Sequence, residues 1–86
     1  MKVYKFGKRG CGPCRMAGMM VDKLAAKYNV EAVAFDVLDN PDLLEQYEIK
    51  SVPCVLILDN NNTIIERLPN FGAIAANLEK ILKEGR

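Results

Sequence analysis

Two cysteines, Cys11 and Cys14, are separated by two residues in the segment Gly10-Cys11-Gly12-Pro13-Cys14. Thiols at this spacing can form a reversible disulfide or bind a metal ion. On a regular helix, Cβ atoms three residues apart are ~5–6 Å from each other, whereas a disulfide needs ~3.5–4.5 Å. The gap closes if Cys11 is the non-helical cap of a helix and Cys14 lies in its first turn. We therefore expect a helix to begin between the two cysteines.

The residues between the cysteines suit that arrangement. Gly12 leaves the approach to the sulfurs open. Pro13 fits an early helical position, where its missing N–H costs little. The segment is therefore suited to forming and breaking a bond between the two sulfurs without refolding.

The start of a helix also favours an ionised thiol, because free N–H groups and the helix dipole stabilise negative charge there. The dipole contributes ~0.3–1 kcal/mol, and at most ~2 kcal/mol when partly buried, whereas lowering a thiol pKa from ~8.5 to ~7 requires ~2 kcal/mol. Hydrogen bonds to the sulfur, or charge from Lys8, Arg9 or Arg15, must therefore assist. We expect Cys11, nearer the loop, to be the exposed nucleophile and Cys14 to be the resolving thiol.

Metal binding is the alternative use of such a pair. Structural zinc takes four ligands, whereas the chain has three cysteines and no histidine. A metal site would need an acidic ligand or a second subunit. We therefore predict neither a metal nor another cofactor.

Composition narrows the class of protein. The chain has 86 residues, enough for one domain, with 12 basic and 11 acidic side chains and a net charge of +1. This balance favours neither nucleic acid nor a membrane surface, and no apolar run approaches the ~20 residues of a membrane helix. No signal peptide is visible, which predicts a cytoplasmic protein whose thiols stay reduced. With an odd number of cysteines, a structural disulfide framework is not expected.

The elements that would position the cysteines follow from hydrophobic periodicity and turn residues. The pattern predicts strands over 2–6, 31–37, 54–58 and 63–68, and helices over 12–28, from Pro41 to Tyr47, and from near Gly72 to Gly85. A turn over 59–62 joins the last two strands. The order β-α-β-α-β-β-α predicts an α/β fold over a single domain, 1–86, with a mixed four-stranded sheet and helices on both faces.

Two segments carry a family resemblance. Cys11-Gly12-Pro13-Cys14-Arg15-Met16 looks like the active-site motif of thioredoxin, and the stretch 47–53, ending in Val52-Pro53, resembles the one that ends in the cis-proline of that family. The similarity extends from the first strand to the last helix. It implies a minimal thioredoxin fold and a monomeric enzyme that reduces protein disulfides through Cys11 and Cys14.

The resemblance also implies how the site is supported. Gly12 and Pro13 belong to the motif. Pro53, if cis, should lie against the cysteines and leave backbone groups of Val52 free to pair with an extended substrate segment. The alternative for Pro53 is an ordinary proline at the start of a strand.

The sequence departs from the family pattern in three places. The chain starts at the motif-bearing strand, an element order shared with glutaredoxins. Gly10 stands where a tryptophan usually precedes the first cysteine. Lys5 stands where thioredoxins carry a buried aspartate that helps to deprotonate the resolving thiol.

Three interpretations of Lys5 stay open. It could pair with Asp36 on the neighbouring strand, or point at the sulfurs and favour a thiolate, in which case Lys5→Met raises the thiol pKa. Alternatively, its stem packs while its head reaches water.

Several other side chains near the motif have two interpretations each. Cys54 is either a small core residue or a third redox thiol. Met16, Met19 and Met20 are either core and helix-surface residues or, in part, an apolar substrate patch. Lys8 and Arg9 either select acidic partners or are solvated loop residues.

The electron donor is open between NADPH-linked thioredoxin reductase and glutathione. Gly12-Pro13 between the cysteines favours the first, since glutaredoxins commonly carry Pro-Tyr or Pro-Phe there, while the short element order favours a glutaredoxin-type enzyme. A rival from another class is a binding subunit whose cysteines are dispensable.

Overall fold

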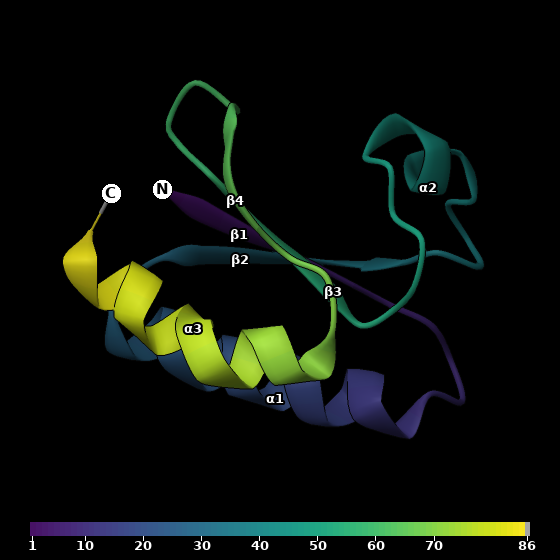
Figure 1. The fold of residues 1–86 in the computed structure, drawn as a ribbon, viewed down its shortest axis with the longest axis horizontal. Coiled ribbons are helices and arrows are strands. Elements are labelled where there is room, and N and C mark those ends of the chain that lie inside the picture. The colour runs from purple at the N-terminus through teal and green to yellow at the C-terminus, as the bar shows by residue number, and fades with distance from the viewer. Residues whose placement is uncertain (86) are drawn as a thin grey trace.

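The computed structural model describes residues 1–85 and confirms the predicted order of elements (Figure 1). These are β1 (Lys2–Gly7), α1 (Gly12–Lys27), β2 (Glu31–Asp36), α2 (Asp42–Gln46), β3 (Cys54–Leu58), β4 (Ile64–Leu68) and α3 (Phe71–Glu84). The predicted bounds differ from these by at most one residue at either end. Within the described range, no helix is long and apolar enough to cross a bilayer.

The four strands form one mixed sheet in the order β2-β1-β3-β4. Strand β1 is parallel to β2 and antiparallel to β3, and β3 is antiparallel to β4. In this register Lys5 lies between Ala34 on β2 and Val55 on β3. The parallel pair is joined by α1, as the β-α-β pattern requires.

Helices cover both faces of the sheet. Figure 1 shows α1 and α3 side by side on one face and the short α2 on the other. All residues of β3 are buried, and their side chains alternate between two cores, as the period of two in a strand dictates. Val55 and Ile57 pack with Leu78 on the α1–α3 face, while Leu56 packs on the face that α2 covers.

Helix α1, which carries the cysteine motif, is held against the sheet by small and branched residues. Ala17, Val21 and Ala25 are buried at four-residue spacing, so they share one face of the helix. The helix has its N-cap at Cys11, at the end of the loop that follows β1. The motif therefore sits at the edge of a rigid framework.

Candidate active site

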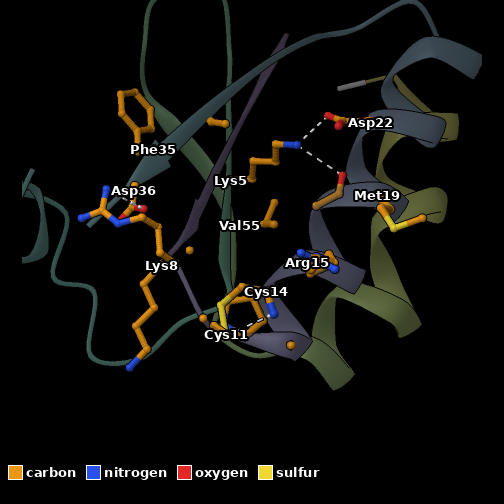
Figure 2. Close-up of a pocket in the computed structure, with 18 of the residues that line it drawn as sticks. Lys5, Lys8, Cys11, Cys14, Arg15, Met19, Asp22, Phe35, Asp36 and Val55 are labelled. Atoms are coloured by element: carbon orange, nitrogen blue, oxygen red, sulfur yellow. Dashed lines mark hydrogen bonds and ion pairs between the residues drawn. A yellow bond between two sulfur atoms is a disulfide. The ribbon is translucent and has the colours of Figure 1, made fainter. Parts of the chain in front are cut away.

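Cys11 and Cys14 are joined by a disulfide, with their Cα atoms 5.2 Å apart (Figure 2). Cys11 is the N-cap of α1 in an extended conformation, and its Sγ accepts a hydrogen bond from the backbone N–H of Cys14 at 3.2 Å. The geometry is the one that the spacing predicts, with one cysteine before the helix and the other in its first turn. Both residues are half-buried, so the expectation that Cys11 is exposed is wrong for this disulfide form. Any difference in role therefore rests on their places in the helix.

Three neighbours shape the space around the disulfide. The Val52–Pro53 peptide bond is cis, and Pro53 is buried and lines the same groove as the cysteines. At Gly12 an added Cβ would meet nothing within 4 Å. At Gly7, the last residue of β1, it would lie 3.1 Å from Cys14 Cβ. This contact depends on how α1 packs on β1, so the sequence alone could not predict it.

A groove of about 960 Å³ extends from the disulfide along α1. Its walls come from the loop before Cys11, from α1 and from the strands β1 and β2. Gly18, Met19 and Ala34 give it an apolar surface, and seven charged residues line it as well. The disulfide is therefore accessible to a partner that lies along this groove.

Lys5 crosses the groove from β1 to α1. Its Nζ is 2.7 Å from Asp22 Oδ1 and donates to the Gly18 carbonyl at 3.3 Å. The predicted pairing with Asp36 is wrong, because Lys5 lies on the α1 face of the sheet, where Asp22 is within reach. Figure 2 shows its side chain pointing toward Asp22 and away from the sulfurs.

Asp36 has a different cationic neighbour, Arg9. The Arg9 guanidinium lies 3.0 Å from both carboxylate oxygens of Asp39 and 3.6 Å from Asp36. The hydrogen bond to Asp39, followed by the charges of Asp39 and Asp36, raises the pKa of Arg9. These contacts tie the loop before the cysteines to the segment after β2.

Lys8 and Arg15 flank the motif, are exposed and line the groove. In the part of the chain that the structure describes, neither forms an ion pair with a side chain. The sequence left two interpretations of Lys8 and Arg9, as cations that select acidic partners or as solvated loop residues. The structure shows that Arg9 is engaged by carboxylates, whereas Arg15 is not.

The remaining sulfur-bearing residues divide between core and surface. Cys54 is a free thiol with 3% of its surface exposed, and burial raises the pKa of this thiol. Met16 and Met19 are 59% and 66% exposed, while Met20 packs against the core. Across residues 1–85, no group of three or more Cys, Asp or Glu side chains is arranged to hold a metal ion.

Comparison with known proteins gives a consistent result. The family model described as Thioredoxin matches residues 2–84. Thioredoxin 1 of Synechococcus elongatus is 34% identical over 77 residues, which cover 84% of this chain and 71% of that protein. The crystal structure of thioredoxin NaTrxh from Nicotiana alata superposes with a TM-score of 0.84 at 28% identity and covers 98% of this chain and 71% of that one. For thioredoxin 1 of Thermosipho africanus, the TM-score is 0.75 at 25% identity, with 94% and 98% covered.

Proposed function

Because this chain belongs to the thioredoxin family of thiol–disulfide oxidoreductases, we propose that Cys11 is the nucleophile that attacks protein disulfides and that Cys14 is the resolving thiol. The family match and the disulfide at the active-site position make the chain a disulfide reductase. The separate roles of the two cysteines are the proposal.

The observation that carries this assignment is the hydrogen bond from the Cys14 N–H to Cys11 Sγ at 3.2 Å. In the reduced enzyme the same N–H would stabilise a Cys11 thiolate, because hydrogen bonds to ionised acceptors are stronger than those to neutral ones. The start of α1 adds its dipole. Both effects favour the thiolate form of Cys11, and the thiolate is the form of cysteine that attacks disulfides.

The reaction then proceeds in two exchanges. The Cys11 thiolate attacks one sulfur of the substrate disulfide, forms a mixed disulfide and releases the other sulfur as a thiolate that takes up a proton. Cys14 loses its proton and attacks Cys11 Sγ, which releases the second substrate thiol. Two electrons pass from the Cys11–Cys14 dithiol to the substrate, and the enzyme ends in the disulfide form described above.

The support residues have assigned roles in this proposal. Gly12 and Pro13 keep the start of α1 open and helical. Pro53 lies on the groove beside the cysteines, which supports a role in seating the substrate. An extended substrate segment would pair with the backbone of Val52, in the way that peptides add to a sheet edge.

The electron donor in this proposal is NADPH-linked thioredoxin reductase, and the enzyme works as a cytoplasmic monomer. The family match supports the donor, as does the Gly12-Pro13 pair between the cysteines. Cytosolic conditions keep dithiols reduced, which suits an enzyme that must be reduced before each turnover.

The test is insulin reduction, run in parallel with NADPH and thioredoxin reductase and with glutathione and glutathione reductase. We expect turnover with thioredoxin reductase. We expect Cys11→Ser to abolish it and Cys14→Ser to accumulate the mixed disulfide, with Cys54→Ala as the control that retains activity. Turnover only with glutathione would show that glutathione, rather than thioredoxin reductase, is the electron donor. Full biological activity of a Cys11→Ser/Cys14→Ser double variant would instead support a binding subunit.

A further inference from the structure

We propose that this enzyme prefers protein disulfides flanked by acidic residues, because Lys8 and Arg15 present positive charge beside its disulfide and pair with no carboxylate of residues 1–85. The inference rests on the proposed function, since it concerns the substrates of that same site. It names a chemical class of substrate, a cystine with Asp or Glu nearby in an exposed segment.

The distribution of charge along the chain is the first step. Between Lys8 and Val21 there are three cations and no acidic residue, and the first turn of α1 holds no acidic side chain. Carboxylates are common in the first turn of a helix, because they oppose its dipole. Here that position stays free of negative charge.

The second step is the pairing of the carboxylates that do line the groove. Asp22 is engaged by Lys5 at 2.7 Å. Asp39 and Asp36 are both engaged by Arg9, at 3.0 and 3.6 Å. Each groove carboxylate thus has a cation, with Arg9 shared by two of them, so the four cations and three carboxylates that line the groove leave a net charge of +1. Lys8 and Arg15, which flank the motif, are the groove cations without a carboxylate partner.

The third step is where these two cations lie. Lys8 precedes Cys11 by three residues, and Arg15 directly follows Cys14. Figure 2 shows their side chains on opposite sides of the disulfide in this view. The exposed Met16, next to Arg15, adds an apolar contact beside the charge. A substrate segment crossing the disulfide would meet a cation on either side.

Charge complementarity of this kind acts mainly on encounter and orientation. Two exposed charges should favour an acidic over a neutral substrate by about fivefold at low ionic strength. The preference should shrink as salt rises, because the screening length falls from ~30 Å at 0.01 M to ~3 Å at 1 M.

The experiment uses the pre-reduced full-length enzyme and two cyclic disulfide peptides, one with Glu and one with Gln around the cysteines. Single-turnover reduction is stopped with acid and measured by chromatography, so that no reductase is involved. Each rate is divided by the rate with dithiothreitol, which corrects for the reactivity of the peptide itself. We expect a ratio of Glu to Gln peptide of about five at 10 mM salt, approaching one at 0.5 M.

The variants separate docking from chemistry. Lys8→Glu with Arg15→Glu should invert the ratio, whereas any effect of these charges on the Cys11 thiolate slows both peptides equally. Lys23→Glu with Lys80→Glu makes the same change of net charge outside the groove lining and should keep the ratio. A ratio of one in the wild type, or a ratio that the groove variant leaves unchanged, would overturn the inference. Failure to reduce either peptide would instead overturn the proposed function.

Discussion

Gly10, the residue before Cys11, has a backbone φ of +80°. The Cys11 N–H donates to the Lys8 carbonyl at 3.3 Å, so residues 8–11 form a tight turn with Gly10 at its third position. That position of a type II turn requires positive φ and favours glycine. The turn therefore gives a physical reason for glycine where the family pattern has tryptophan.

The prediction at this residue compares two glycines. Gly10→Ala should lower the free energy of unfolding by about 1–2 kcal/mol, the cost of a left-handed conformation for a residue with a Cβ. Gly12→Ala should change it by less than about 0.5 kcal/mol, because the site is open and helical. Urea denaturation of the oxidised proteins measures both. Equal effects at the two positions would contradict the turn argument.

Cys54 gives a prediction about pH. Burial raises the pKa of its thiol, so at alkaline pH the unfolded chain ionises here before the folded protein does. The unfolded state then binds fewer protons than the folded state. The ionisation of Cys54 therefore lowers the free energy of unfolding as pH rises. At pH 8 the wild type should have a higher free energy of unfolding than Cys54→Ala. This difference should become smaller above pH 9. A difference that stays constant in urea titrations would refute this.

At the scale of elements, β1 and α1 are joined by a polar contact beside the site. Lys5 reaches from the strand to Asp22 and the Gly18 carbonyl on the helix. A Cβ added at Gly18 would lie 3.5 Å from Lys5 Nζ, an ordinary van der Waals contact, so the link does not require glycine at this position. The link therefore fixes the helix on the strand rather than charging the sulfurs.

The corresponding prediction is that Lys5→Met leaves the Cys11 thiolate titration unchanged. In a double-mutant cycle with Asp22→Asn, the coupling should be below about 1 kcal/mol, because the Asp22 side chain is 63% exposed. Alkylation rates against pH and urea denaturation provide the two readouts. A rise of the thiol pKa in Lys5→Met would restore the interpretation that this lysine favours the thiolate.

At the scale of the whole molecule, the sheet separates two apolar cores of different build. The larger one lies under α1 and α3, and its buried residues are all aliphatic. The other lies under α2 and includes the aromatic rings of Tyr4, Phe6, Phe35 and Tyr47, with Phe6 and Phe35 stacked at 5.2 Å. Strand β3 contributes to both cores, so its integrity supports the entire fold.

Truncation of a buried side chain in either core should therefore strongly lower the free energy of unfolding of this small domain. Leu56→Ala and Leu78→Ala, both at fully buried positions, should each lower the free energy of unfolding by about 2–5 kcal/mol, out of a total of about 5–15 kcal/mol. Leu38→Ala, at a residue 54% exposed, is the matched control and should be nearly neutral. A small loss from Leu56→Ala alone would show that the α2 core adds little.

Local sequence pattern was sufficient to predict much of the fold and the place of the cysteine pair. The element order follows from periodicity and turn residues, and the place of Cys11 at the start of α1 follows from the spacing of two cysteines around Gly12 and Pro13. Such features depend on residues within a few positions of one another. The sequence alone therefore determined the fold class and the reactive pair.

Only the tertiary structure determined which charged side chains form ion pairs and which do not. Asp22 rather than Asp36 meets Lys5, and Asp39, 30 residues along the chain, meets Arg9. The contact of Gly7 with Cys14 likewise arises only when α1 lies on β1. These pairings depend on strand order and helix placement, because side chains distant in sequence can pair only after packing brings them within about 4 Å.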